Sequence, residues 1–264
     1  MATLMSYISI QFNMYESLKN KRILITGASA GIGSAIAEHL AGFGACVGIH
    51  YRQNKKGAQD ILDKIKHLPG KAALFEGDLL LESVRNNLIS DFIGVFGGID
   101  GLVNNAGGTF GYQHFSVLDE QSWDNAYCLN TKAPFILTRK AFQYMKSHGG
   151  GRIINITTVA VKYVGPKSMH YTSSKAALDT LTIGFAREGA KHNILVNSIR
   201  CGVIDTPMHT KIDGYKEDDF QKRARLIPLQ RLGTPADIAR MASFLMSECG
   251  DFITGEFFAV AGGD

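Results

Sequence analysis

Short apolar runs alternate with longer segments of helical periodicity from residue 21 to the C-terminus. The runs are continuously apolar, as is typical of parallel strands covered on both faces. They lie at residues 22–26, 45–50, 72–76, 101–104, 152–157, 194–200 and 256–260. Between them apolar residues recur at near-helical spacing, for example Ile32, Ile36 and Leu40. This alternation predicts a single-domain α/β fold, a doubly wound parallel sheet of about seven strands flanked by helices.

Composition limits the class of protein. A length of 264 residues suits one large α/β domain, and a net charge of +4 is mild, with basic residues in short groups. A nucleic-acid partner is therefore not expected. No apolar run reaches the about 20 residues of a membrane span, so no membrane association is expected. The four cysteines are far apart and form no CxxC pair, which favours a cytoplasmic location over a disulfide or zinc framework.

The first residues differ from the rest of the chain. Ile8, Ile10 and Phe12 are apolar, but no basic start and no clean apolar core accompany them. A signal peptide is a poor interpretation of such a segment. We expect residues 1–18 to be an N-terminal extension ahead of one domain over residues 19–264.

A glycine-rich segment follows the first predicted strand directly. Gly27, Gly31 and Gly33 stand in the order G-x-x-x-G-x-G, at the turn into the next helix. Glycines there let the backbone approach a pyrophosphate, and the helix N-terminus offers free N–H groups and a partial positive charge. The segment predicts a nucleotide site, the alternative being a glycine-lined turn that only packs.

The same residues also match another motif. Residues 27–31 read G-x-S-x-G, the nucleophile elbow of serine hydrolases, with Ser29 as the nucleophile. That class needs an upstream sheet and a histidine after the acid, yet few residues precede the motif and no histidine follows His209. A hydrolase is therefore disfavoured.

The end of the second predicted strand bears on the choice of dinucleotide. NAD sites normally place a carboxylate there, on the ribose hydroxyls. This chain has Tyr51 followed by Arg52. A guanidinium can bind a 2′-phosphate with charge-assisted hydrogen bonds, so NADP(H) is favoured over NAD(H), unless Arg52 is only a surface arginine.

A tyrosine and a lysine open a strongly helical segment. Tyr171 and Lys175 are four residues apart, so both can face one site from the same side of a helix. A nearby cation stabilises phenolate and lowers the tyrosine pKa toward the working range of an acid–base catalyst. Alone, such a pair is common by chance.

In combination these motifs resemble the short-chain dehydrogenase/reductase family, over about residues 20–264. The family pattern has a TGxxxGxG loop, an NNAG after the fourth strand, a helix asparagine, a hydroxyl after the fifth strand, and YxxxK. The chain supplies residues 104–107 as NNAG, then Asn130, Thr157-Thr158 and Tyr171 with Lys175, in that order. The resemblance implies a Rossmann-type fold and hydride transfer between a nicotinamide and a carbonyl or alcohol.

Catalytic roles follow from the resemblance. Tyr171 would be the general acid/base, Lys175 would orient the nicotinamide ribose and lower the Tyr171 pKa, and Asn130 would hold a water of a proton relay. The family's hydroxyl is usually a serine thirteen residues before the tyrosine, and here that place holds Thr158. Threonine keeps the donor but adds a β-methyl that narrows the substrate pocket. Thr157 is the less favoured candidate for the residue that supplies this hydroxyl.

The resemblance also implies a set of NADP(H) contacts. Asp78 would bind adenine or cap the next helix, and Asn105 with Ala106 would line the adenosine ribose. After the sixth strand the family usually reads proline-glycine, where this chain has Cys201 and Gly202; we expect the cysteine to be a packed residue rather than a reactive thiol. The cofactor-binding set is Gly27, Ser29, Ala30, Gly31, Ile32, Gly33, Arg52, Asp78, Leu79, Asn105, Ala106, Gly107, Tyr171, Lys175, Ile204 and Thr206.

Substrate and assembly are less determined. Within the family, the chain most resembles 3-oxoacyl-[acyl-carrier-protein] reductases. The expected substrate is therefore a small carbonyl or alcohol compound, and a thioester of an acyl-carrier protein is one option. Gly149 and His192 stand where those reductases use arginines, although Arg152 and Lys191 are nearby. Sugar, steroid or xenobiotic substrates stay open, as does a catalytically silent nucleotide-sensing relative. A substrate lid is expected around residues 205–227, and a homotetramer from the tail.

Overall fold

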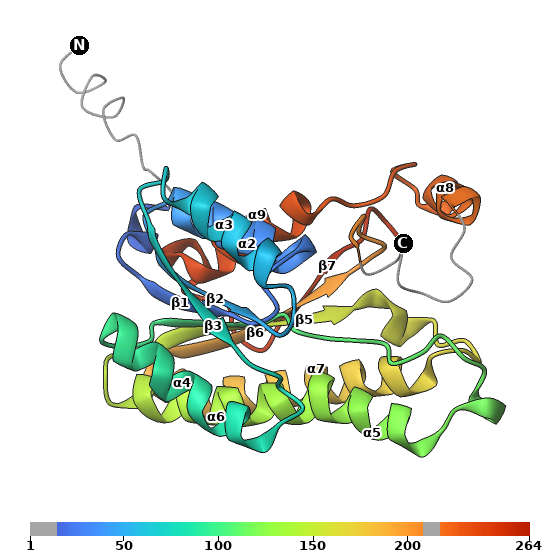
Figure 1. Cartoon of the computed structure of the whole chain (residues 1–264), viewed down its shortest axis with the longest axis horizontal. Helices are drawn as coiled ribbons and strands as arrows, with labels where there is room; N and C mark the ends of the chain where they lie inside the picture. The colour runs from blue at the N-terminus through green and yellow to red at the C-terminus, as the bar shows by residue number, and fades with distance from the viewer. Residues whose placement is uncertain (1–14, 208–216) are drawn as a thin grey trace, which may run out of the picture.

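The computed structural model describes residues 15–207 and 217–264. Seven parallel strands form one sheet in the order β3-β2-β1-β4-β5-β6-β7 (Figure 1). The strands are β1 (Arg22–Ile25), β2 (Cys46–Tyr51), β3 (Lys71–Glu76), β4 (Gly101–Asn104), β5 (Gly151–Thr158), β6 (Ile194–Cys201) and β7 (Phe257–Val260). Each end lies within one residue of its predicted run. The predicted doubly wound Rossmann-type sheet is confirmed.

Helices cover both faces of the sheet (Figure 1). On one face lie α2 (Gly31–Gly42), α3 (Lys55–Ile65) and α9 (Pro235–Met246). On the other lie α4 (Glu82–Phe96), α5 (Glu120–Tyr127), α6 (Ala133–Lys146) and α7 (Met169–Gly189). Helix α8 (Glu217–Leu226) stands beyond the carboxyl ends of the strands.

Two buried cores explain why the strands read as unbroken apolar runs. Side chains along a strand point alternately to the two faces. In β1, Ile23 and Ile25 join the core under α2, α3 and α9, whereas Leu24 joins the core under α4, α6 and α7. All three are at most 1% exposed. A strand with helices on both faces therefore carries mostly apolar side chains, and a polar one that it buries, such as Asn155 of β5, is hydrogen-bonded within the fold.

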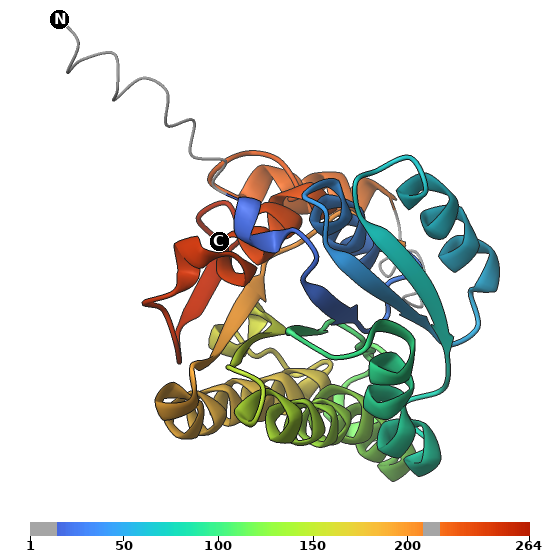
Figure 2. The same ribbon diagram turned by 90° about the vertical axis from the view of Figure 1, so that its left-hand side faces the viewer.

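The folded domain begins earlier than residue 19. Leu18, in the short turn η1 (Glu16–Leu18), is fully buried, and the rings of Tyr15 and Phe43 lie 4.3 Å apart. Figure 2 shows η1 beside the C-terminal part of the chain, where the Glu248 N–H donates to Ser17 Oγ at 3.0 Å. Residues 1–14, and residues 208–216 of the expected lid, lie outside the described residues.

The strand order reverses between β1 and β4. The chain winds from β1 toward β3 on one side, and from β4 toward β7 on the other. Such a reversal opens a crevice at the carboxyl ends of the strands, where open α/β sheets bind ligands. No helix within the described ranges has the length and apolar character that crossing a bilayer requires.

Candidate active site

The glycine loop and the segment after β4 meet at this crevice. The Asn105 amide donates to Thr26 O at 2.8 Å and to Gly27 O at 3.0 Å. In return, Thr26 Oγ1 accepts from the N–H groups of Asn105 and Ala106, both at 3.0 Å. The Asn105 side chain, expected to line the ribose, is therefore engaged in holding the glycine loop.

The N-terminus of α2 has the features of an anion site. Gly27 and Gly31 have φ of 63° and 59°, in the left-handed region that favours glycine. The N-cap residue, Ala30, offers no side-chain cap. A Cβ on Gly33 would lie 2.5 Å from Gly27 O, so only glycine permits this approach of helix and loop. The uncapped N–H groups and the partial positive charge of the helix fit a dinucleotide pyrophosphate.

His50 lies directly beneath the loop, a role that sequence reasoning missed. The Gly27 N–H donates to His50 Nδ1 at 3.2 Å, and His50 Nε2 lies 3.1 Å from Gly77 O. The ring is 2% exposed, and burial lowers its pKa from 6.5 to about 4. Neutral His50 with its proton on Nε2 satisfies both contacts, so it ties the glycine loop to the end of β3.

The expected adenosine half of the site is exposed. Arg52 Nη1 lies 3.8 Å from Asp78 Oδ2, with side-chain exposures of 48% and 32%. Asp78 Oδ1 accepts from the Leu80 N–H at 2.9 Å, while the N-cap of α4 is Leu81, so Asp78 does not cap that helix. Leu79 is 3% exposed and packs in the core.

Helix α7 carries Lys175 into the crevice from the opposite face. Lys175 is 3% exposed, and its Nζ donates to the carbonyl oxygen of Ile156 in β5 at 2.7 Å. Burial lowers the pKa of this ammonium to about 8, opposed by Cys201 and Asp179. A buried cation that can lose its proton near neutrality is a typical component of a catalytic site.

Tyr171 and Thr158 are brought together. The Thr158 hydroxyl lies beside the Tyr171 phenol and favours its charged form. Thr157 is turned the other way, with its Oγ1 2.7 Å from Ser198 Oγ of β6. The structure thus distinguishes the two adjacent threonines: Thr158 faces Tyr171, and Thr157 faces Ser198.

The pKa of Tyr171 does not follow the expected direction. Burial raises it, the Cys201 thiol adds to the increase, and the nearby Thr158 hydroxyl opposes it. The expected lowering by Lys175 is not seen, because burial dominates and the Lys175 ammonium is directed to the Ile156 carbonyl. In this state Tyr171 is a protonated phenol at neutral pH.

Asn130 lies in a π-helical turn, η3 (Cys128–Lys132), between α5 and α6. Such single turns are frequent at functional sites. The residue is fully buried; its Oδ1 accepts from the Gly108 N–H, and its Nδ2 donates to Gly108 O and Ser174 Oγ, all at 3.0 Å. A Cβ on Gly107 would lie 3.1 Å from both Asn130 Oδ1 and Lys175 Nζ, so these two side chains meet over Gly107.

The segment after β6 closes the crevice. Cys201 pairs in register with Thr158, and burial raises the pKa of its thiol to about 12, as suits a packed residue. Ile204 is 3% exposed and bridges to Gly233. A Cβ on Gly31 would lie 3.2 Å from the Thr206 methyl, which places Thr206 at the start of α2.

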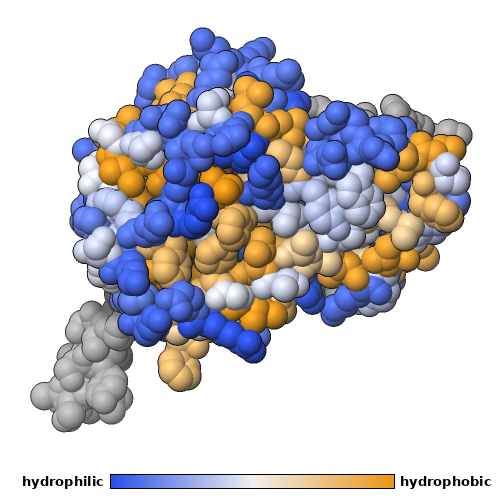
Figure 3. All heavy atoms as spheres, turned by 90° about the horizontal axis from the view of Figure 1, so that it is seen from below, coloured by the Kyte–Doolittle hydropathy of each residue, from blue (hydrophilic) through white to orange (hydrophobic). Residues whose placement is uncertain are grey.

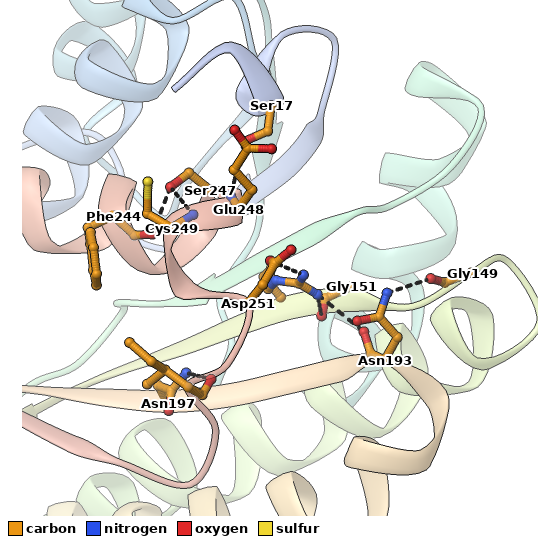
Figure 4. Close-up of polar contacts among 12 residues, drawn as sticks. Ser17, Gly149, Gly151, Asn193, Asn197, Phe244, Ser247, Glu248, Cys249 and Asp251 are labelled. Carbon is orange, nitrogen blue, oxygen red and sulfur yellow. Dashed lines mark hydrogen bonds and ion pairs between the residues drawn. The ribbon is translucent and has the colours of Figure 1, made fainter. Parts of the chain in front are cut away.

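The opposite edge of the sheet is built differently (Figure 4). Gly149 O accepts from Asn193 Nδ2 at 3.1 Å, and Arg152 Nη2 lies 2.5 Å from Asp251 Oδ1. These residues line a polar cavity of about 280 Å³. Gly149 precedes β5 and His192 precedes β6, so both stand at the amino ends of the strands, whereas Tyr171 is at the carboxyl ends. The arginine positions compared above therefore lie away from the catalytic edge.

Comparisons with known proteins agree with this geometry. A family model described as enoyl-(acyl carrier protein) reductase matches residues 27–264. The 3-oxoacyl-[acyl-carrier-protein] reductase FabG of Aquifex aeolicus (strain VF5) is 35% identical over 253 residues, covering 95% of this chain and 99% of that protein.

Two solved structures are also similar. One is a 7α-hydroxysteroid dehydrogenase complexed with NADH and 7-oxo glycochenodeoxycholic acid: TM-score 0.88, 34% identity, 96% of this chain and 98% of that chain. The other is a short-chain dehydrogenase from Burkholderia cenocepacia J2315 in complex with NADP: TM-score 0.85, 31% identity, 94% and 98%. With the motifs, the fold and the site in agreement, the chain belongs to the short-chain dehydrogenase/reductase family.

Proposed function

We propose that the protein is an NADP(H)-dependent oxidoreductase that interconverts a carbonyl compound and a secondary alcohol. One observation carries the proposal. The Thr158 hydroxyl, the Tyr171 phenol and the Lys175 ammonium converge at the carboxyl edge of the sheet, beside the uncapped start of α2. The bound nicotinamide would supply or accept the hydride.

Each side chain has a definable role in reduction. Tyr171 is protonated at neutral pH, because burial raises its pKa, so it can donate its phenolic proton to the carbonyl oxygen. Thr158 polarises the same oxygen as a hydrogen-bond donor. Lys175 stabilises the resulting phenolate, and Asn130, across Gly107 from Lys175, completes a relay that returns the proton.

NADP(H) rather than NAD(H) is proposed because of Arg52. Its half-exposed guanidinium forms an ion pair with Asp78 at 3.8 Å, and its Nη2 donates a long hydrogen bond to Gln53 Oε1 at 3.4 Å. A pair this long and exposed contributes little, so the guanidinium can turn to a 2′-phosphate at small cost. Of the similar structures, one holds NADP and another NADH, so relatives of both kinds share this fold.

The 3-oxoacyl thioester remains the first substrate class, in view of the similar 3-oxoacyl reductase. A specific observation favours a second class, bulky apolar ketones such as steroids or xenobiotics. Two segments leave the catalytic edge after Gly107 and Thr158 and are joined by a bridge between His114 and Lys167. They expose large apolar side chains: Tyr112 49%, Phe115 59%, Tyr163 68% and Val164 50%.

Two further expectations belong to the proposal. A catalytically silent relative is disfavoured because Tyr171 and Lys175 are both present at the site. A homotetramer fits the outer faces of the helices. Figure 3 shows apolar patches on the face formed by α4, α5, α6 and α7, and Trp123 and Phe135 of this layer are 42% and 36% exposed.

The test is turnover with defined cofactors. The protein is mixed with NADPH or NADH and a panel of ketones, comprising a 3-oxoacyl thioester, a polycyclic ketone and an oxidised sugar, and the nicotinamide absorbance is followed. The proposal predicts oxidation of NADPH with at least one ketone and a lower kcat/KM with NADH. Absence of turnover across the panel, or a preference for NADH, would contradict it.

A further inference from the structure

A buried carboxylate lies one helical turn beyond Lys175 on α7. Asp179 is 4% exposed. Its Oδ2 accepts from Arg200 Nε of β6 at 3.0 Å, and its Oδ1 accepts from Ser198 Oγ at 2.9 Å. Both carboxylate oxygens are therefore engaged, in an ion pair that the roles assigned above do not use.

The Asp179–Arg200 ion pair is held by contacts with residues of three strands, β5, β6 and β7. Thr157 Oγ1 lies 2.7 Å from Ser198 Oγ, which links the pair to the residue beside Thr158 in β5. The Arg200 guanidinium lies over the ring of Phe257 in β7, 4.3 Å from its centroid. The Arg200 side chain is only 20% exposed. Charges fixed in this way exert a constant field on their neighbours.

Lys175 is within that field. Two titratable groups act on its ammonium, Asp179 from α7 and Cys201 from β6, and Tyr171 shares its helix. Cys201 stays a neutral thiol at pH 7, since burial raises its pKa to about 12. Of these groups, Asp179, which is in an ion pair with Arg200, carries the negative charge that acts on Lys175. Charges interact over longer distances in the interior than in water, so a carboxylate one turn away is effective.

We propose that Asp179 and Arg200 are positioning residues that set the charge of the Tyr171–Lys175 pair from beneath the site. Asp179 holds the proton on the pair, and Arg200 offsets that effect. Both act through Lys175. The inference rests on the proposed function, because it takes Tyr171 and Lys175 as the groups that transfer the proton.

The two charges have opposite consequences. In the proposed mechanism Lys175 stabilises the Tyr171 phenolate, so a pH profile of turnover would report apparent pKa values that belong to both groups. Without the charge of Asp179, either group loses its proton more easily and the apparent pKa falls. Without the charge of Arg200, Asp179 is uncompensated and the apparent pKa rises. If Asp179 and Arg200 only held α7 against β6, the two substitutions would not shift the apparent pKa in opposite directions.

The experiment measures kcat/KM against pH for oxidation of an alcohol that the wild-type enzyme accepts. Asp179→Asn keeps one acceptor oxygen, for Arg200, and its NH2 can donate to the Ser198 hydroxyl. The substitution removes the charge, and we expect the apparent pKa to fall by about half a unit or more. Arg200→Gln should raise the apparent pKa by a similar amount. Arg200→Lys, the matched control, keeps the positive charge and should leave the profile in place.

Opposite shifts in the two charge variants support the inference. Shifts in the same direction, or lower kcat with an unmoved profile, overturn it. If Asp179→Asn does not fold, Arg200→Gln against Arg200→Lys decides. Wild-type protein that turns over no alcohol contradicts the proposed function instead; the pH dependence of NADPH affinity, measured by fluorescence on the same variants, then tests the inference without a substrate.

Discussion

The catalytic half and the adenosine half of the crevice are held in place by different means. Lys175 is 3% exposed and Asn130 fully buried, and each makes short hydrogen bonds to the protein itself. The Arg52 side chain is 48% exposed, and its two contacts are long: 3.8 Å to Asp78 and 3.4 Å to Gln53. The groups proposed to perform chemistry are thus held by the protein itself, as electrostatic preorganisation requires. The arginine proposed to recognise the cofactor is held only by long, exposed contacts.

This contrast predicts how substitutions divide. A change of the Tyr171 or Thr158 hydroxyl should alter turnover at nearly unchanged NADPH affinity, because these hydroxyls act on the reacting oxygen. A change in the exposed half should alter NADPH affinity at unchanged turnover, since uniform binding lowers KM without raising kcat.

The largest effect is expected at Tyr171. Tyr171→Phe removes the proton donor but keeps the ring that packs in the site. We expect kcat to fall by about a thousandfold or more, the scale of lost acid–base catalysis. Steady-state kinetics with NADPH and the best ketone of the panel measure it. Turnover within a few-fold of wild type would assign proton transfer to another group.

The second largest effect is expected at Thr158. Thr158→Val is nearly isosteric but lacks the donor, so we expect a loss of about 2.7–4 kcal/mol of transition-state stabilisation, seen in kcat/KM. Thr158→Ser keeps the donor and should stay active, with better acceptance of bulky ketones. Thr157→Val is the matched control, because Thr157 faces Ser198 rather than Tyr171. A crippled Thr157→Val beside an active Thr158→Val would move the assignment by one residue.

Arg52 tests the exposed half. Arg52→Ala should weaken NADPH binding by about 1.5–3 kcal/mol, toward the lower limit because the side chain is half exposed, and leave NADH binding nearly unchanged. Titration of cofactor fluorescence gives both dissociation constants. Arg187→Ala, in the last turn of α7, is the control for loss of an exposed arginine. Equal losses for both cofactors would indicate general disruption instead.

The smallest effect concerns His50 and pH. Its pKa is about 4 in the folded protein against 6.5 ordinarily, so the unfolded chain binds more protons between these values. The stability from neutral His50 is therefore present above pH 6.5 and is lost as the pH falls toward 4. From pH 7 to 5.5 the wild type should lose about 1 kcal/mol that His50→Leu does not lose, by denaturant unfolding at both pH values. Equal pH dependence of the two proteins would contradict this.

Much of this molecule could be predicted from its sequence because the relevant signals are local. Parallel strands buried on both faces must read as apolar runs, and β6, predicted at residues 194–200, is observed at Ile194–Cys201. Glycine spacing marks the loop before α2, and a four-residue interval places Tyr171 and Lys175 on one helix face.

What the sequence could not predict depends on contacts between distant segments. His50 lies 27 residues from its partner Gly77, and Asp179 lies 21 residues from Arg200, with no spacing rule to link either pair. The π-turn at Asn130 and the rise of the Tyr171 pKa depend on how tightly the elements pack. Such couplings are properties of the assembled fold.

The most direct test of the division between the two halves is a crossed measurement on Tyr171→Phe and Arg52→Ala. NADPH affinity is measured by fluorescence, and kcat is measured at saturating NADPH, on both variants and the wild type. We expect Tyr171→Phe to bind NADPH like the wild type while its kcat falls about a thousandfold or more, and Arg52→Ala to bind NADPH weakly while its kcat is retained. Loss of both quantities in either variant would contradict it.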